Sequence, residues 1–218
     1  MESLEKTVKI SSMIKRVGIN GIRADAKAAL AVVKPEEVPN RYAIGFDDSG
    51  SMGEEGIKDA HKAIAGFLAA CSPLETSVAI YPYNREAKPL TNMFDVVNAY
   101  VAGIKATGGT PLWGILGKML RESKLTRGII FSDGGATDEE GDEINYAREH
   151  SIKIDTVFIG HGSDNAVLQR IAECTGGVYL KFDSTTTFGK QLKYLSPKYV
   201  ALLANADLKA RIERGEQI

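Results

Sequence analysis

A short apolar run that ends in a loop crowded with oxygen atoms constrains this chain more than any other stretch. Residues 42–46 are mostly apolar, as expected of a buried strand. The loop that follows carries carboxylates and hydroxyls at Asp47, Asp48, Ser49 and Ser51. Gly50 and Gly53 allow this loop to turn back tightly before a helical pattern starts near residue 55. Because ligands bind in open α/β sheets where loops leave the carboxyl ends of strands, the stretch predicts both a fold and a site.

The spacing of the oxygen atoms in this loop indicates a metal site. Asp47, Ser49 and Ser51 stand two residues apart, in the order Asp-x-Ser-x-Ser. One carboxylate and two hydroxyls that converge would form a hard-oxygen site, which suits Mg²⁺, Mn²⁺ or Ca²⁺. The competing explanation is a loop whose serines only cap the following helix.

From residue 41 onward, strand patterns alternate with helix patterns. Strands are predicted at 42–46, 77–83, 128–131, 152–159 and 178–180, and helices near 55–68, 94–104, 112–120, 138–150, 167–172 and 188–195. A short edge strand is predicted at 87–93, because Pro89 disfavours a central position. The alternation predicts an α/β fold: a doubly wound, mostly parallel, Rossmann-like sheet flanked by helices.

The chain divides into three predicted segments. Residues 1–40 are expected to be a helical N-terminal extension, closed by a linker at Pro35 and Pro39. Residues 41–195 form the α/β domain, and residues 196–218 a C-terminal helix. Helices this short are marginal in isolation, so we expect both ends to dock on the domain or on a partner.

Two further loops carry oxygen ligands that can join the first loop in space. Thr110 follows a pair of glycines, and Asp133 follows the predicted strand at 128–131. Each has a simpler explanation: Thr110 before Pro111 is a good helix start, and Asp133 before two glycines can stabilise a turn. All three loops are expected at one edge of a doubly wound sheet, and their joint occurrence favours a shared site.

Three motifs together resemble the von Willebrand factor A domain family. They are the segment 46–52 (Phe-Asp-Asp-Ser-Gly-Ser-Met), the segment 108–112 (Gly-Gly-Thr-Pro-Leu) and the segment 130–134 (Ile-Phe-Ser-Asp-Gly). The similarity continues through residues 157–160 and 168–179 and covers about 41–195. One departure is Ser132, where many members have threonine, and we do not expect it to impair the site.

The resemblance implies a metal-ion-dependent adhesion site on five residues of this chain: Asp47, Ser49, Ser51, Thr110 and Asp133. It implies a six-coordinate divalent cation, expected to be Mg²⁺ with Mn²⁺ or Ca²⁺ as alternatives, and direct ligation by the two serine hydroxyls. Two carboxylates neutralise one divalent cation, which leaves an open position that attracts an acidic group. The implied function is metal-dependent binding of a protein partner that offers an Asp or Glu side chain.

Composition narrows the classes of function that remain for this chain. A net charge of −1 gives no general attraction to nucleic acid or to a membrane surface, and no apolar run approaches the length of a membrane span. Cys71 and Cys174 are either a disulfide or two buried thiols, and we favour thiols in a reducing cytoplasm. Bacterial or phage relatives of this kind work beside AAA+ ATPases, which suggests such a system as partner by analogy alone.

An enzyme is the rival hypothesis. A Mg²⁺-dependent phosphohydrolase on a similar sheet would need a nucleophile and a general acid in the first loop, whereas Ser49 is a weak nucleophile with no evident base. We therefore predict that the chain is not an enzyme; an inert structural subunit is a third alternative. The three histidines, His61, His150 and His161, lack the spacing of zinc ligands and are predicted to be ordinary surface or loop residues. The acidic run at 138–143 is attributed to a helix N-terminus, with a second cation or a basic partner as the alternative.

Overall fold

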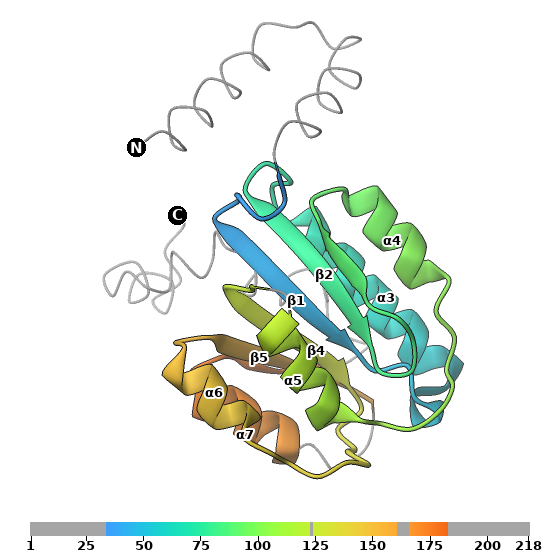
Figure 1. Ribbon diagram of the computed structural model, residues 1–218. Coiled ribbons are helices and arrows are strands. Elements are labelled where there is room, and N and C mark those ends of the chain that lie inside the picture. Colours follow the sequence, from blue (N-terminus) through green and yellow to red (C-terminus); the bar gives the residue numbers. More distant parts are fainter. Residues whose placement is uncertain (1–33, 123, 161–165, 183–218) are drawn as a thin grey trace, which may run out of the picture.

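The structure is a computed structural model that describes residues 34–122, 124–160 and 166–182, and it shows a six-stranded sheet between two layers of helices (Figure 1). The strands are β1 (Asn40–Phe46), β2 (Thr76–Pro82), β3 (Lys88–Thr91), β4 (Arg127–Ser132), β5 (Lys153–Ile159) and β6 (Tyr179–Phe182). Their order is β3-β2-β1-β4-β5-β6, and all neighbours are parallel except β2 and β3. The predicted α/β fold is confirmed, and so is the short edge strand with Pro89, which is β3 and runs antiparallel to β2.

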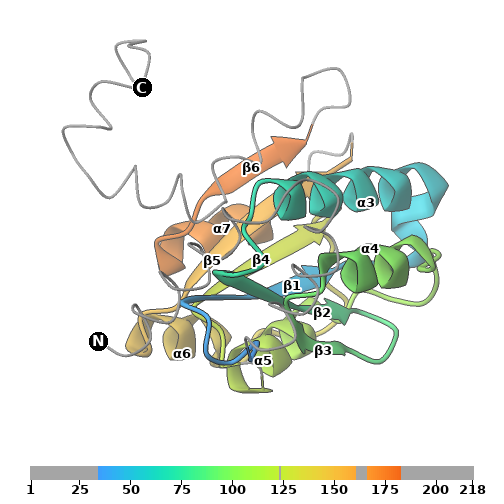
Figure 2. The ribbon, with the colours of Figure 1, turned by 90° about the horizontal axis from the view of Figure 1, so that it is seen from above.

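The helices of the described residues cover both faces of the sheet. They are α3 (Gly53–Ala69), α4 (Phe94–Ala102), α5 (Leu112–Glu122), α6 (Glu143–Glu149) and α7 (Ala166–Thr175), with a short 3-10 turn, η1, at Gly50–Met52. The helices α3 and α4 pack on one face, and α5, α6 and α7 pack on the other (Figure 2). This division follows from right-handed crossovers that reverse direction on either side of β1.

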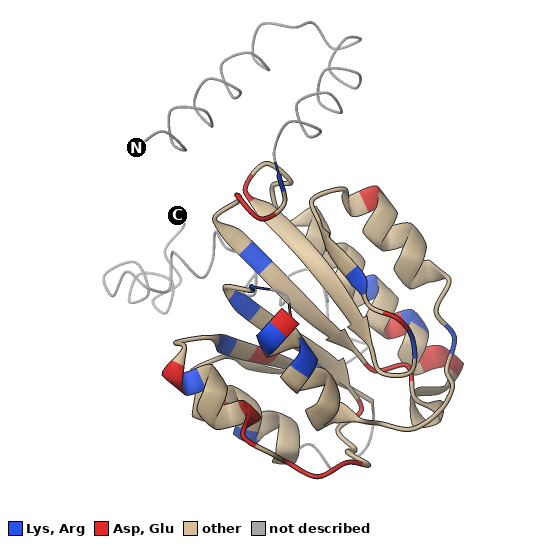
Figure 3. Ribbon diagram, viewed as in Figure 1, with Lys and Arg blue, Asp and Glu red and all other residues tan. Residues whose placement is uncertain are grey.

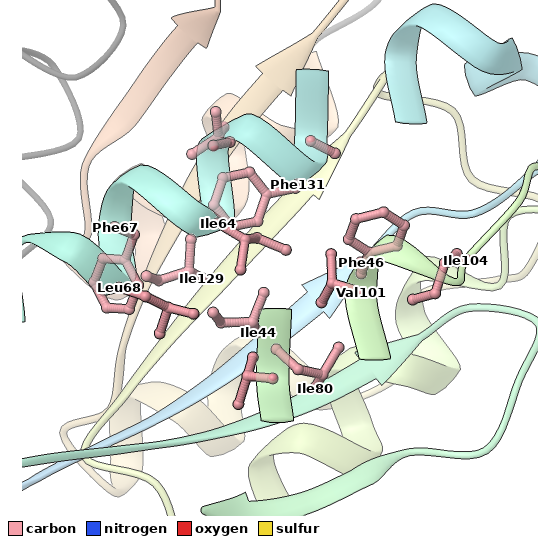
Figure 4. Close-up of a cluster of buried hydrophobic side chains, with 14 of the residues drawn as sticks. Ile44, Phe46, Ile64, Phe67, Leu68, Ile80, Val101, Ile104, Ile129 and Phe131 are labelled. Atoms are coloured by element: carbon pink, nitrogen blue, oxygen red, sulfur yellow. The ribbon is translucent and has the colours of Figure 1, made fainter. Parts of the chain in front are cut away.

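The first helix after β1 shows why these segments fold as they do. Glu54 and Glu55 lie in its first turn, where negative charge is favourable. Its apolar residues recur every three or four positions and form one buried stripe: Ile57, Ala60, Ile64, Phe67 and Leu68. This stripe meets the β-branched and aromatic side chains of the central strands to form one of the two cores (Figure 4).

The register of the central strands brings three loops to one edge of the sheet. β1 lies between β2 and β4, and Phe46 at its end pairs with Pro82 on one side and with Phe131 on the other. All three strands run in the same direction and end level. The residues that follow these register partners, at 47, 83 and 132, are therefore neighbours although they are far apart in the sequence.

Some sequence predictions need correction. The acidic helix predicted at 138–150 begins only at Glu143, because Asp138 is committed to another helix, as described below. The predicted linker at 35–39 is packed against the domain: Val38 is buried, and the Ser77 hydroxyl donates to the Pro35 carbonyl. The predicted helices before residue 34 and after residue 182 lie outside the described residues.

The cysteine prediction was half right. Both Cys71 and Cys174 are free thiols, as favoured from the sequence. However, only Cys71 is substantially buried, and burial raises the pKa of its thiol to about 12. Cys174 is exposed on α7, so the prediction that both would be buried was wrong.

A buried ion pair ties the opposite end of the sheet together. The Arg127 guanidinium donates two hydrogen bonds, of 2.5 and 2.6 Å, to the fully buried carboxylate of Asp155. The same carboxylate accepts a hydrogen bond from the Val178 amide, just before β6. One acidic side chain thus joins β4, β5 and the start of β6. The ion pair stabilises the fold only while both of its members are present, because either charge alone would be buried and unpaired.

Removing one member of this pair should be strongly destabilising. We expect Arg127→Met to lower the free energy of unfolding by about 3–5 kcal/mol, because it leaves the Asp155 carboxylate buried and unpaired. The double variant Arg127→Met/Asp155→Asn should recover part of this loss, because Asn is neutral and still accepts the Val178 hydrogen bond. Urea denaturation measures both; equal midpoints for Arg127→Met and wild type would contradict the role given to the pair.

Candidate functional site

Asp47 is the fixed point of the predicted site. Its amide donates to the Phe131 carbonyl of β4, at 2.9 Å. One carboxylate oxygen accepts the Ser49 amide at 2.9 Å, and the other accepts the Ser132 hydroxyl at 2.6 Å. Burial raises the pKa of Asp47 above the ordinary aspartate value, the hydrogen bonds from Ser132 and Ser49 oppose the rise, and the charge of Asp133 adds to it. The side chain is therefore fully buried and held by both oxygens.

The two serines of the first loop turn their hydroxyls toward each other. The Ser49 and Ser51 hydroxyl oxygens lie 2.9 Å apart. Ser49 is buried and Ser51 is exposed, so the pair runs from the interior to the surface. The tight turn after them is made at Gly53, whose φ of 57° suits glycine, whereas Gly50 belongs to η1 and has no positive φ.

Asp48, next to Asp47, does a different job. Its carboxylate is fully buried and accepts hydrogen bonds from the Asn84 amide and side chain and from Arg85 Nε, at 2.9, 3.1 and 3.0 Å. Its carbonyl accepts the Thr107 amide at 2.6 Å. Asp48 therefore joins the first loop to the β2–β3 turn and to the loop before α5, and its oxygen atoms are already bound.

The loop that carries Thr110 is fastened to the first loop by its backbone. The Gly50 amide donates to the Gly108 carbonyl at 3.1 Å, and Asn84 Nδ2 donates to the Gly109 carbonyl at 2.8 Å. Gly108 has a φ of 69°, and a Cβ there would lie 2.3 Å from Asn84 Oδ1. Only glycine allows this close approach, which explains one of the two glycines in the motif.

Thr110 is not the cap of the helix that follows it. The carboxylate of Asp138 instead accepts the amides of Trp113 and Gly114 in the first turn of α5, at 3.2 and 2.7 Å. Thr110 is bound through its backbone: its amide donates to the Thr137 hydroxyl, and its carbonyl accepts the Thr137 amide. The helix-cap explanation is therefore wrong, and the buried Thr110 side chain is not used to cap α5.

The third loop closes a ring of contacts. Asp133 follows Ser132 at the end of β4, is half-buried, and acts electrostatically on Asp47. The first loop thus contacts the second through Gly50, the second contacts the third through Thr110, and the third contacts the first through Ser132. The structure brings together the three loops on which the predicted residues lie: Asp47, Ser49, Ser51, Thr110 and Asp133.

The acidic run beyond this loop is accounted for by local contacts. Figure 3 shows these acidic residues along the connection between β4 and α6. Glu140 pairs with Arg170, Asp142 pairs with Arg121, and Glu143 accepts the Gly141 amide. The attribution of this run to a helix N-terminus is confirmed for Asp142 and Glu143, which begin α6, and Asp138 serves the N-terminus of α5 instead. It was wrong for Glu139 and Glu140, which precede α6.

The two described histidines lie on different helices, His61 in α3 and His150 at the end of α6. Among the described residues, no group of three or more His, Cys, Asp or Glu side chains is arranged to hold a metal. His61 stacks on Phe46 inside the α3 layer, and burial lowers its pKa, so it is not the surface residue predicted. His150 stacks on Tyr146 at the end of α6, and His161 lies outside the described residues. The predicted oxygen site differs from such a group, because it has only two carboxylates and its other ligands are three hydroxyls.

Sequence reasoning gave no role to three residues that lie beside the predicted ligands: Ser132, Tyr83 and Asn84. A signal was available for the first two. Side chains alternate along a strand, so Ser132 and Tyr83 share the α5 face with Asp47 once β2, β1 and β4 end level. For Asn84 the sequence offers no comparable signal, because its contacts depend on the shape of the turn between β2 and β3.

No helix of the described residues is both long enough and apolar enough to cross a membrane. A comparison with curated protein sequences gave no match. The family model for the von Willebrand factor type A domain matches residues 43–194.

Solved structures share the fold at low sequence identity. A von Willebrand factor type A protein from Catenulispora acidiphila has a TM-score of 0.61 at 18% identity, over 72% of this chain and 42% of that chain. The VWA domain of SpRpn10 has a TM-score of 0.56 at 14% identity, over 72% and 95%. An aerotolerance-related membrane protein from Bacteroides fragilis has a TM-score of 0.54 at 15% identity, over 70% and 96%. These likenesses concern the fold alone.

The family match covers most of the chain, and the fold is shared with solved structures of von Willebrand factor type A domains. The chain therefore belongs to the von Willebrand factor type A domain family.

Proposed function

We propose that this domain binds one divalent cation at the three-loop edge and, through it, an acidic side chain of a partner protein. The cation ligands are Asp47, Ser49, Ser51, Thr110 and Asp133. The observation that carries the proposal is the pair of Ser49 and Ser51 hydroxyls, 2.9 Å apart beside the immobilised Asp47 carboxylate. Such a cluster of fixed hard oxygens is the donor set that Mg²⁺ or Mn²⁺ takes in proteins, with Ca²⁺ as the alternative.

The electrostatics of this edge fit a cation. Asp47 and Asp133 repel each other, which contributes to the raised pKa of Asp47. The nearby guanidinium of Arg85 is bound to Asp48 and does not offset that repulsion. A divalent cation between the two carboxylates would remove it and would supply a Lewis-acidic position for an incoming oxygen ligand.

The open side of the site supports a carboxylate ligand from a partner. Ser51 is exposed and Asp133 is half-buried, so the edge can be reached from solvent, whereas Asp47 and Ser49 lie beneath it. With two carboxylates already neutralising the cation, an Asp or Glu of the partner gains a charge-assisted contact. Stripping water from both charged groups offsets much of this gain, so apolar contacts around the site must supply the rest of the affinity.

The rival function, a Mg²⁺-dependent phosphohydrolase, has less support. A hydrolase needs an activated nucleophile, and the hydrogen-bond partner of the Ser49 hydroxyl is another hydroxyl, that of Ser51. The carboxylate of Asp47 is engaged with Ser132 and with the Ser49 amide, so it is not positioned as a base for Ser49. We infer a binding module without turnover of its own.

The two adjacent aspartates should separate metal binding from stability. We expect Asp47→Asn to abolish Mg²⁺ binding while leaving the metal-free protein at least as stable as wild type, because it removes a buried charge that faces Asp133. The matched control Asp48→Asn should lower the free energy of unfolding by about 1–3 kcal/mol, because Arg85 loses its charged partner. Calorimetric titration and thermal unfolding measure the two effects. Wild-type Mg²⁺ affinity in Asp47→Asn would sink the ligand assignment.

Metal binding should weaken in mild acid. A cation needs the ionised form of Asp47, and the raised pKa of Asp47 moves its protonation above the ordinary aspartate range. The stability of the metal-free protein should change with pH in the opposite direction. Because the pKa of Asp47 is raised in the folded state, ionised Asp47 destabilises the fold at pH values above that pKa. Any stability advantage of Asp47→Asn should therefore fade as pH falls from about 7 to about 4. Titrations of wild type across this range check the first effect. An affinity that stays constant down to about pH 4 would contradict it.

Partner binding and hydrolysis can be tested side by side. Once a partner is captured, we expect its binding to be lost with EDTA, restored by Mg²⁺, and lost when one Asp or Glu of the partner is changed to Asn or Gln. A panel of phosphate esters should show no metal-dependent release of phosphate by the same preparation. Release that disappears in Asp47→Asn would favour the phosphohydrolase, and capture indifferent to EDTA would refute the metal bridge.

A further inference from the structure

Tyr83 is a buried side chain at the proposed site whose hydroxyl has no hydrogen-bond partner among the described residues. It follows β2 directly, and its amide donates to the Phe46 carbonyl at 3.0 Å, so its backbone lies beside the start of the Asp47 loop. Its ring belongs to the apolar cluster under α5, together with Tyr81 and Leu112, and the residue is only 5% exposed. The ring is therefore held in place by packing.

The surroundings of this hydroxyl are polar and acidic. It makes no hydrogen bond with any described residue, although it is shielded from solvent. Burial raises the pKa of Tyr83 well above its ordinary value and the charge of Asp47 adds to the rise, whereas the neighbouring Ser132 hydroxyl opposes it and the charges of Asp138 and Asp133 add smaller increases. An unpaired hydroxyl in such a place costs free energy, and phenylalanine would pack the same space without that cost.

Ser132 can accept the missing hydrogen bond. Its hydroxyl donates to Asp47 and accepts the Gly134 amide, at 2.6 and 3.1 Å. A serine hydroxyl has one donor and two acceptor positions, so one acceptor position remains. A hydrogen bond from Tyr83 to this position would extend a chain from Tyr83 through Ser132 to the Asp47 carboxylate. Such chains polarise their members and strengthen one another.

We propose that Tyr83 is a positioning residue of the metal site, whose hydroxyl donates to Ser132 when the cation is bound and so holds the Asp47 carboxylate in its ligating orientation. The inference rests on the proposed function and adds a residue to it. Tyr83 touches neither the cation nor the partner. Its effect reaches the metal only through Ser132 and Asp47, and the packed ring contributes to the core in either state.

The test is the conservative variant Tyr83→Phe, which removes the hydroxyl and keeps the ring. We expect its Mg²⁺ affinity to fall about 3- to 10-fold, the worth of one hydrogen bond. The melting temperature of the metal-free protein should stay the same or rise, because the removed hydroxyl has no partner there. The matched control is Tyr81→Phe, which lies two residues earlier, inside β2, and belongs to the same apolar cluster; its Mg²⁺ affinity should equal that of wild type.

A double-mutant cycle with Ser132→Ala tests whether Tyr83 acts on the metal site through Ser132. In the Ser132→Ala background, Tyr83→Phe should cause no further loss of Mg²⁺ affinity, because the acceptor is gone. Equal affinity of Tyr83→Phe and wild type, additive losses in the cycle, or a lower melting temperature of metal-free Tyr83→Phe would each overturn the inference while leaving the metal site intact. Failure of wild type to bind Mg²⁺ would instead overturn the proposed function, and this inference with it.

Discussion

The parallel pairing of β1 with both β2 and β4 is the constraint on which the site depends. It places the residues after Phe46, Pro82 and Phe131 side by side, and the pleat then turns Asp47, Ser132 and Tyr83 toward the same face. A shift of one residue in either pairing would send those side chains to opposite faces. The two apolar cores above and below the sheet hold this register, so the oxygen cluster is positioned by packing remote from it.

The loops are held by hydrogen bonds from side chains that are not among the proposed ligands. The Asp48 carboxylate accepts hydrogen bonds from Asn84 and Arg85. The Asp138 carboxylate accepts amides in the first turn of α5, and the Thr137 hydroxyl accepts the Thr110 amide. These contacts settle the loop conformation before any ligand arrives. Such preorganisation reduces the entropy lost on binding, and it leaves the repulsion between Asp47 and Asp133 for a cation to relieve.

The sequence allowed the strand–helix order and the three site loops to be predicted, because periodicity and strand-end chemistry are local signals. It failed where the answer depends on a tertiary partner. From the sequence, Thr110 resembled the cap of the next helix, and Asp138 resembled the start of α6. In the structure the Asp138 carboxylate binds the first turn of α5, a contact between residues far apart in the sequence. The different tasks of Asp47 and Asp48 are also invisible in the sequence, since only the turn at Asn84 and Arg85 distinguishes them.

The central claim is that one divalent cation sits among the three loops. The most direct measurement is a crystal structure of the protein with Mn²⁺, with anomalous diffraction used to locate the metal. The account predicts one strong anomalous peak at the edge of the sheet, within direct contact of the Ser49 and Ser51 hydroxyls and close to Asp47, Thr110 and Asp133. The absence of a peak there under conditions where Mn²⁺ is in excess, or a peak only at another cluster of acidic residues, would contradict it.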